Sequence, residues 1–292
     1  MFKLAAITDE IAQDFAHACD VVKEYGGVGA EIRSVWDTKV QALSDQQIKE
    51  MRAILGDKGM RVCCIASPFF KCDLGDAQAY REHLDMLRRC LEIAHAFGIN
   101  LIRGFTFWRK GPLEPVWGRI VGSFPEVVKI LDEMDGVLGI ENEASCYLGT
   151  GGEVARLLAE VNHPRLGAVW DGANQVFAHA EPAYPDGYEA VRDRMVHCHV
   201  KDASWDGQKG DARCTPIGEG DIDYRGQMRA LIEDGYQGFV SLETHWRPAE
   251  QELTQAQMSR PGGAAFSSKG EYGSRVCFEN LVRLINEVGG NA

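Results

Sequence analysis

Short, almost continuously apolar runs alternate along the chain with longer stretches whose apolar residues recur at helical spacing. Runs that are apolar throughout are typical of parallel strands, which helices cover on the outside. The predicted strands are residues 4–8, 29–33, 61–67, 101–105, 137–142, 166–171, 195–200 and 239–243.

The stretches between these runs predict helices, and some carry recognisable end signals. Ser44 precedes one of them with Gln47 three residues later, a pattern that resembles a capping box. Gly26 and Gly98 follow two others at the position of a C-cap. The predicted helices are residues 14–25, 45–58, 76–97, 116–135, 151–161, 188–194, 224–234 and 275–288.

Eight repeats of a strand followed by a helix favour an α/β fold, a single (β/α)₈ TIM barrel over residues 1–292. A doubly wound open sheet is the alternative, but its first strand is usually followed by a glycine-rich phosphate turn. Here Thr8, Asp9 and Glu10 stand at that point. The long irregular stretch 248–273 follows the last predicted strand, so we expect it to lie over the catalytic face as a lid or an oligomer contact.

Composition narrows the classes of function. The chain has 292 residues and a formal net charge of -12, which opposes binding to nucleic acid or to an anionic membrane. Its nine cysteines are odd in number and form no CxxC motif, so we expect no disulfide framework and a reducing compartment. Neither a signal peptide nor a membrane span is expected, which predicts a soluble, cytoplasmic protein.

Four consecutive predicted strands end in a side chain that can bind a metal ion: Glu141, Asp171, His199 and Glu243. The carboxyl ends of barrel strands meet on one face, where catalytic groups gather. Three carboxylates and one imidazole suit one hard or borderline divalent ion, with Mn²⁺ expected first and Mg²⁺, Co²⁺ or Zn²⁺ as alternatives. Any one of these residues alone could be an ordinary salt-bridge partner, but four in succession predict a metal site.

The chain resembles the xylose-isomerase-like TIM barrels of the sugar phosphate isomerase/epimerase superfamily over nearly its whole length. The resemblance rests on GAEIR from Gly29, GIEN from Gly139, WDGAN from Trp170, HCHVKD from His197, GEGDIDY from Gly218 and SLETH from Ser241. The metal ligands of that family fall on the same four residues.

The resemblance implies a metal-dependent isomerase or epimerase that acts on a ketose, a keto-polyol or a related sugar through an enediolate. Glu141 and Glu243 would then be the catalytic residues that exchange protons with the substrate. Five further polar residues near predicted strand ends are candidates for substrate binding, although salt bridges or structural hydrogen bonds would also explain some of them. These candidates are Glu31, Arg103, Asn174, Lys201 and His245.

Three positions depart from the ketose 3-epimerases of this family. Tyr147, Asn174 and Trp205 stand where those enzymes usually carry a glutamate, a histidine and an arginine that contact substrate. The metal ligands are therefore retained while the substrate contacts differ, which argues against a ketohexose 3-epimerase in the narrow sense.

Three other functions compete with this interpretation. A metal-dependent lyase could perform dehydration or β-elimination on a keto-inositol or a 3-keto-glycoside through the same kind of intermediate. An apurinic endonuclease would need additional metal ligands and a surface less acidic than this one. A catalytically silent barrel need not retain an ion. The resemblance also implies a homo-oligomer, a dimer or a tetramer.

Overall fold

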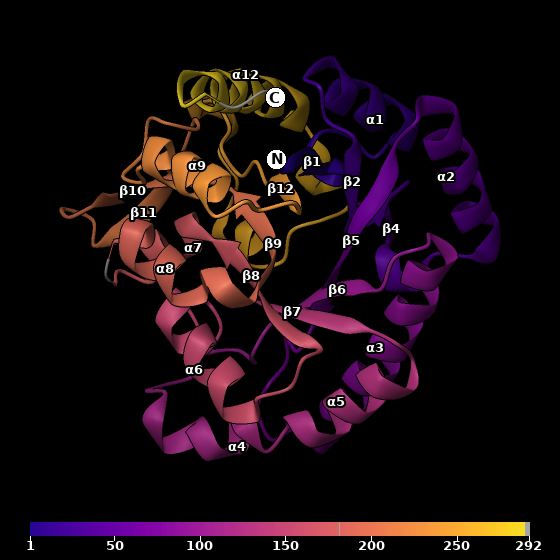
Figure 1. The fold of residues 1–292 in the computed structure, drawn as a ribbon, viewed down its shortest axis with the longest axis vertical. Helices are drawn as coiled ribbons and strands as arrows, with labels where there is room; N and C mark the ends of the chain where they lie inside the picture. Colours follow the sequence, from indigo (N-terminus) through magenta and orange to yellow (C-terminus); the bar gives the residue numbers. More distant parts are fainter. Residues whose placement is uncertain (181, 290–292) are drawn as a thin grey trace.

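Eight parallel strands close into a ring at the centre of the molecule, in the order β1-β12-β9-β8-β7-β6-β5-β2 (Figure 1). The computed structural model describes residues 1–180 and 182–289, so four residues of the predicted domain 1–292 lie outside the described part. The barrel strands are β1 (Lys3–Ile7), β2 (Gly29–Ile32), β5 (Arg61–Phe69), β6 (Leu101–Gly104), β7 (Val137–Glu141), β8 (Leu166–Asp171), β9 (Met195–Val200) and β12 (Phe239–Leu242). The predicted TIM barrel is confirmed.

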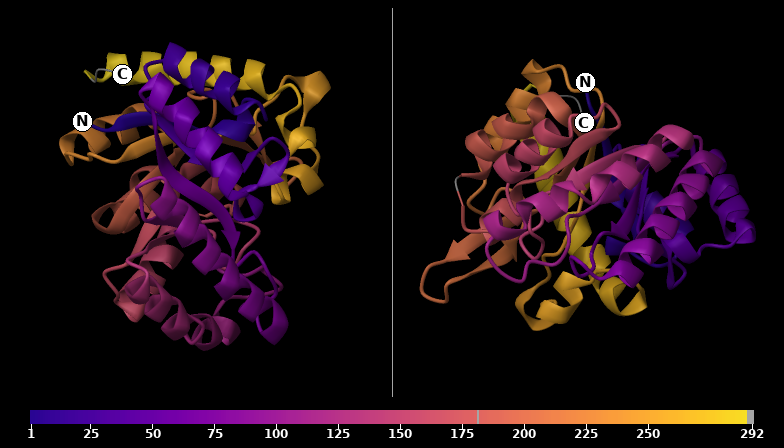
Figure 2. Two further views of the ribbon diagram at one scale, coloured as in Figure 1. Left: turned by 90° about the vertical axis from the view of Figure 1, so that its right-hand side faces the viewer. Right: turned by 90° about the horizontal axis from the view of Figure 1, so that it is seen from below.

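Helices surround this ring (Figures 1 and 2). The Ser44 capping box is present at the start of α2, with Gln47 bonded back to Ser44 as predicted. The longer helices are α1 (Phe15–Glu24), α2 (Asp45–Lys58), α3 (Ala77–Ala96), α5 (Phe124–Glu133), α6 (Gly151–Val161), α9 (Tyr224–Glu233) and α12 (Gly270–Glu287). The shorter ones are α4 (Trp117–Val121), α7 (Gly172–Phe177), α8 (Tyr188–Val191), α10 (Gln255–Ser259) and α11 (Ala264–Ser267).

Two predicted helices differ from the structure. The single helix expected over 116–135 is wrong, because α4 and α5 are separate and Pro125 lies in the first turn of α5. Proline has no N–H to continue a helix but is tolerated in a first turn, so a new helix begins there. The last helix begins at Gly270, five residues before the predicted start at 275.

Two small hairpins were not predicted. β3 (Ser34–Val35) pairs with β4 (Thr38–Lys39) just beyond β2, and β10 (Asp202–Asp206) pairs with β11 (Asp211–Thr215) just beyond β9. The β10–β11 hairpin projects from the body of the protein (Figure 2). Both hairpins pair antiparallel outside the barrel, so neither belongs to the strand–helix repeat on which the prediction was based.

The core has two parts because side chains alternate between the two faces of each barrel strand. The larger cluster fills the space between strands and helices. The smaller one comes entirely from strands and contains Ala5, Cys63 and Cys64, packed with Leu101 and Phe239. At Gly29 a Cβ atom would lie 2.6 Å from the Phe239 ring, so the tight packing here requires glycine.

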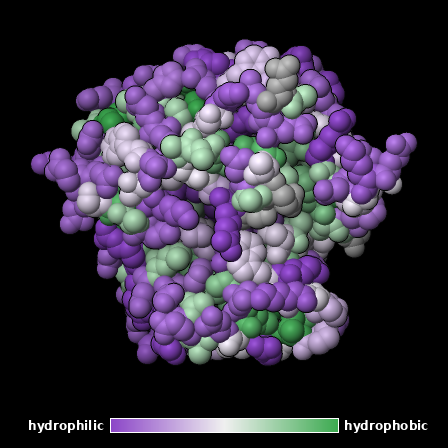
Figure 3. Space-filling view, turned by 180° about the vertical axis from the view of Figure 1, so that it is seen from behind, coloured by the Kyte–Doolittle hydropathy of each residue, from purple (hydrophilic) through white to green (hydrophobic). Residues whose placement is uncertain are grey.

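The predicted long loop 248–273 contains the short helices α10 and α11 and lies at one end of the barrel (Figure 2). All nine cysteines are free. Within residues 1–180 and 182–289, no helix combines the length and apolar character that a membrane crossing requires. On the face drawn in Figure 3, hydrophilic residues predominate and hydrophobic ones form small, separate groups.

Candidate metal centre

The four predicted metal ligands converge at one end of the barrel. Glu141 and Asp171 are the last residues of β7 and β8, His199 lies one residue before the end of β9, and Glu243 follows β12 directly. One ligand atom from each lies within 4.8 Å of the others, and all four residues are buried. The strands β12, β9, β8 and β7 are consecutive neighbours in the ring, so their ends bring the four side chains to one point.

His199 is held in the orientation that a metal-binding histidine needs. Its Nδ1 faces the cluster, 3.3 Å from Glu141 Oε1 and 3.8 Å from Glu243 Oε2. Its Nε2 lies 3.1 Å from Glu31 Oε1 on the opposite side. A carboxylate on the second ring nitrogen fixes the tautomer and leaves the first nitrogen free to bind an ion.

Glu31 is therefore placed behind His199, and it is not among the residues that line the cavity described below. Its Oε2 also lies 2.9 Å from Nε2 of His197. Burial raises the pKa of Glu31, but His199 and His197 outweigh this effect and hold it well below its usual value. The structure thus gives Glu31 a hydrogen-bonding position beneath the ligands.

Lys201 forms ion pairs with two of the ligands. Its Nζ lies 2.6 Å from Glu243 Oε2 and 2.9 Å from Asp171 Oδ2. Burial lowers the pKa of Lys201, but Asp171 and Glu243 raise it well above its usual value, so the ammonium stays charged. Asp171 has its pKa raised to about 7, chiefly by burial and by Glu243 and Glu141, against the opposing effect of Lys201.

Glu141 is contacted by two of the predicted substrate-binding residues. Arg103 Nη1 lies 3.0 Å from its Oε2, and Asn174 Nδ2 donates to its Oε1 at 3.1 Å. Burial lowers the pKa of Arg103, but Glu141 and Glu243 raise it above the usual value.

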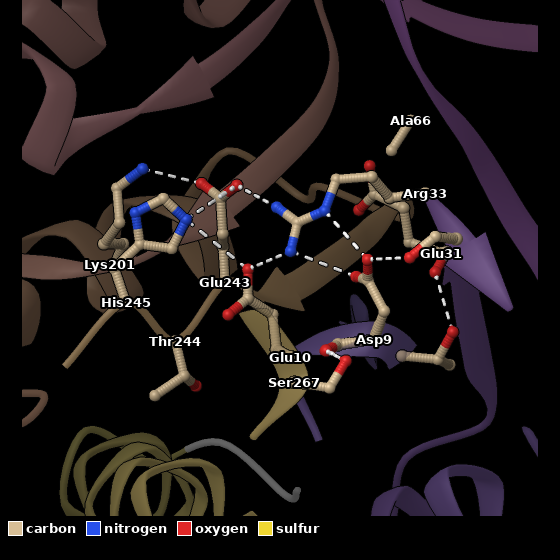
Figure 4. Close-up of polar contacts among 12 residues, drawn as sticks. Asp9, Glu10, Glu31, Arg33, Ala66, Lys201, Glu243, Thr244, His245 and Ser267 are labelled. Carbon is tan, nitrogen blue, oxygen red and sulfur yellow. Dashed lines mark hydrogen bonds and ion pairs between the residues drawn. The ribbon is translucent and has the colours of Figure 1, made fainter. Parts of the chain in front are cut away.

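A further ion-pair network, which the sequence did not predict, adjoins Glu243 (Figure 4). Arg33 Nη1 lies 3.3 Å from Glu243 Oε1. Its Nη2 lies 2.6 Å from Glu10 Oε1 and 3.0 Å from Asp9 Oδ1. His245 Nε2 lies 3.4 Å from Glu10 Oε1 and 3.6 Å from Glu243 Oε1. Asp9 and Glu10 follow β1 and Arg33 follows β2, so the strand-end rule applied to the first two strands could have found them.

The residues present fit a divalent cation. Asp171 Oδ2 is buried and, within residues 1–180 and 182–289, has the Lys201 ion pair at 2.9 Å but no hydrogen-bond partner. Among the described residues of the ion-pair network, six carboxylates face four lysine and arginine side chains. When all six are ionised, two negative charges remain for the histidines or a bound ion. The carboxylates are Asp9, Glu10, Glu31, Glu141, Asp171 and Glu243, and the cations are Arg33, Arg103, Lys201 and Arg247.

A cavity of about 90 Å³ opens onto this cluster. Glu141 and Glu243 line it together with four of the five predicted substrate-binding residues, namely Arg103, Asn174, Lys201 and His245. Met258 and Pro261 of the long loop 248–273 also line it. The loop thus forms part of the wall of the cavity.

Of the three positions that depart from ketose 3-epimerases, Tyr147 and Trp205 lie outside this cavity. Tyr147 is 5% exposed and belongs to the main core. Trp205 is on the β10–β11 hairpin, where its ring stacks on His179 at a centroid distance of 3.7 Å. Of the three replaced positions, Asn174 is the one whose side chain lines the cavity.

A family model described as a xylose isomerase-like TIM barrel matches residues 19–260. The chain belongs to this family. Curated relatives of this xylose isomerase-like barrel include a fructoselysine 3-epimerase of Escherichia coli O157:H7, which is 29% identical over 178 residues. That match covers 58% of the chain and 62% of the relative, so the chain spans about three-fifths of the epimerase's length. An inosose dehydratase of Yersinia enterocolitica is 23% identical over 259 residues, 77% of the chain and 80% of the relative.

Solved structures share the fold at lower identity. A xylose isomerase-like TIM barrel protein from Mycobacterium smegmatis, in complex with magnesium, superposes with a TM-score of 0.63 at 19% identity, covering 91% of this chain and 89% of that one. The IOLI protein with a bound zinc atom gives a TM-score of 0.73 at 16% identity, covering 98% and 99%. Structural neighbours have therefore been crystallised with magnesium or zinc, and the curated relatives are enzymes.

Proposed function

We propose that this protein is a divalent-metal-dependent isomerase or epimerase that acts on a ketose, a keto-polyol or a related sugar through an enediolate. One observation carries the proposal. Glu141 and Glu243 line one small cavity, and both belong to the carboxylate–histidine cluster that fits a metal ion. The epimerase among the curated relatives supports it.

Glu141, Asp171, His199 and Glu243 would hold the ion, with His199 binding through Nδ1. When bound, a divalent ion supplies Lewis acidity that polarises the substrate's carbonyl and stabilises negative charge on its oxygens. Manganese remains the first expectation, and magnesium, cobalt and zinc also suit this set of ligands.

Glu141 and Glu243 would move the protons. In the barrel, β7 and β12 are separated by β9 and β8, so the two carboxylates reach the cavity from different sides. One would take the carbon-bound proton and the other would return a proton to the opposite face, which inverts the carbon. Arg103 and Asn174 hold Glu141 in place, and Arg33 and Lys201 do the same for Glu243.

Lys201 and His245 would contact the substrate. Lys201 lines the cavity with a charged ammonium and would donate to an oxygen that gains negative charge as the proton leaves. His245 also lines the cavity, and its contacts with Glu10 and Glu243 orient its ring.

Solvent deuterium exchange tests the proton transfers. The manganese-loaded protein is incubated in D₂O with fructoselysine, tagatose, inosose and a 3-keto-glycoside, and the products are followed by NMR and mass spectrometry. We expect deuterium at the carbon that changes configuration. With two bases, Glu141→Gln and Glu243→Gln would each stop net conversion, yet each would retain exchange from one of the two epimers.

The control is Glu50→Gln, which removes an exposed carboxylate from α2 and should leave exchange unchanged. Metal content is measured for every variant, so that loss of the ion is distinguished from loss of the base. Full turnover by both glutamine variants with metal bound would disprove the acid–base assignment.

The second candidate is a lyase, favoured by the inosose dehydratase, whose match covers more of this chain than that of the epimerase. The substrate of a lyase loses water or a larger leaving group, so its product has a lower mass, whereas epimerisation conserves mass. Mass spectrometry in the same experiment therefore separates the two functions.

A further inference from the structure

A second, larger cavity adjoins the candidate metal centre. Its volume is about 290 Å³, against about 90 Å³ for the first. Lys71, Arg103, Phe105 and Pro261 line both cavities, so the two meet at these residues. A substrate whose reacting carbons lie at the metal ligands could therefore extend into this second cavity.

The second cavity is basic, although the chain as a whole carries a net charge of -12. Five lysine and arginine residues and one histidine line it, and no aspartate or glutamate occurs among its described lining residues. Three of the five, namely Arg33, Lys71 and Arg103, are ion-paired with Glu243, Glu143 and Glu141 respectively. Their charge is therefore largely matched within the protein.

The remaining two cations, Lys39 and Arg260, have no ion-pair partner in the part of the chain that the structure describes. Lys39 is exposed at the end of β4, and Arg260 is exposed just after α10, 5.8 Å from the centre of the Trp108 ring. Exposed charges normally stay in water, but these two line one cavity whose described lining residues include no aspartate or glutamate.

Local contacts bring these two cations together. Gly263 N–H donates to Ser34 Oγ at 2.9 Å, and Ala264 N–H donates to Asp37 Oδ1 at 2.7 Å. The β3–β4 hairpin that carries Lys39 is thereby fastened to the loop that carries Arg260. The fold thus places the backbone of both residues beside one cavity.

His83 adds a further polar group to the wall of the second cavity. His83 Nδ1 accepts the Phe70 N–H at 2.8 Å, which places the ring proton on Nε2. Burial lowers the pKa of His83, which favours the neutral ring, and His83 is one of the residues that line the cavity.

We propose that this second cavity binds an anionic group, a carboxylate or a phosphate, carried by the sugar whose reacting carbons lie at the metal centre. The inference rests on the proposed function and narrows its substrate class to anionic ketoses and their adducts. Lys39 and Arg260 would pair with the anion, and Trp108 would pack against the linking carbons.

Matched substrates test the inference. The manganese-loaded protein is given a neutral hexulose, the same hexulose carrying a phosphate, and its adduct with an amino acid, which carries a carboxylate. We expect kcat/KM to be higher for one or both anionic forms. In the double variant Lys39→Gln/Arg260→Gln, the ratio of anionic to neutral kcat/KM should fall about 10- to 100-fold, as expected for lost charge-assisted contacts.

The control is Lys49→Gln/Arg88→Gln, which removes two exposed cations from α2 and α3 that have no ion-pair partner among the described residues. It changes the net charge by the same amount and should leave the ratio unaltered. A ratio that is unaltered in the Lys39/Arg260 variant, or that falls equally in the control, would overturn the inference.

Binding gives a readout that does not require turnover. Inorganic phosphate and acetate are titrated into the same variants while tryptophan fluorescence is followed, and Trp108→Phe identifies the signal from this cavity. Weaker binding in the Lys39/Arg260 variant alone supports the anion site even if no sugar reacts. In that case the proposed function fails, and with it the assignment of the anion to a sugar, while the anion site itself stands. The opposite result is that sugars turn over with no preference for charge and that all variants bind the anions equally. That result refutes this inference and leaves the proposed function intact.

Discussion

Replacing Glu31 with glutamine should weaken metal binding without altering any residue that contacts the ion. The Glu31 carboxylate accepts from His199 Nε2 at 3.1 Å and from His197 Nε2 at 2.9 Å, and all three side chains are buried. Glutamine has nearly the same volume but only one oxygen. Its amide nitrogen would face one of the two imidazole N–H groups, so one histidine loses its acceptor.

The expected magnitude follows from these contacts. Loss of a carboxylate behind a metal-binding histidine typically lowers metal affinity about 10- to 100-fold, or roughly 1.4 to 2.7 kcal/mol. We expect the upper part of that range, because the variant also places an N–H group opposite an N–H group in a site that water does not reach.

Competition against a chromophoric chelator measures the effect, with Mn²⁺ and Zn²⁺ titrated separately at a fixed pH. The matched control is Glu143→Gln, since Glu143 is ion-paired with Lys71 at 2.8 Å and contacts no histidine. Circular dichroism checks that both variants fold. If Glu31→Gln binds both ions as tightly as the wild type, the idea that Glu31 orients His199 as a ligand is refuted.

Two further predictions concern stability. Lys201→Met removes the ammonium that pairs with Asp171 and Glu243, so the metal-free protein should lose about 3 to 5 kcal/mol, as for a broken buried ion pair. Added Mn²⁺ should raise its melting temperature more than that of the wild type, and an equal rise would contradict this reasoning. His83→Phe removes the acceptor of the Phe70 N–H and should cost about 1 to 3 kcal/mol in urea unfolding at pH 8. Because burial lowers the pKa of His83, protonation favours the unfolded chain, and its contribution is lost as pH falls below about 6.5. The difference between variant and wild type should therefore narrow at pH 5.5, and a difference that stays constant with pH would count against it.

Local sequence determined most of the barrel. The bounds predicted for β8 and β9 are those observed. β8 is a continuous apolar run that ends at Asp171, and β9 ends at Val200, just before the charged residues Lys201 and Asp202. The helix expected over 116–135 was wrong because apolar spacing alone does not reveal where a helix restarts, here at Phe124 with Pro125 in the first turn. The hairpins β3–β4 and β10–β11 were missed because their short strands carry no strong pattern and are held by the loops around them.

The four candidate ligands were predictable for a physical reason that lies in the chain itself. A residue at the carboxyl end of a parallel barrel strand must reach the same face as its neighbours, whatever the rest of the structure does. Glu141, Asp171, His199 and Glu243 needed only the strand ends to be located correctly. What the sequence determined is therefore the barrel and the composition of its candidate centre.

Tertiary structure alone decided which charges are neutralised and which stay free. Glu31 lies beneath His199, and Arg33 lies between Glu10 and Glu243, because distant strands close into a ring. Lys39 and Arg260 are 221 positions apart in the numbering, yet they line one cavity because a loop after the last strand folds against the hairpin after the second. Neighbourhoods of this kind depend on ring closure and loop packing, which no local pattern of residues records.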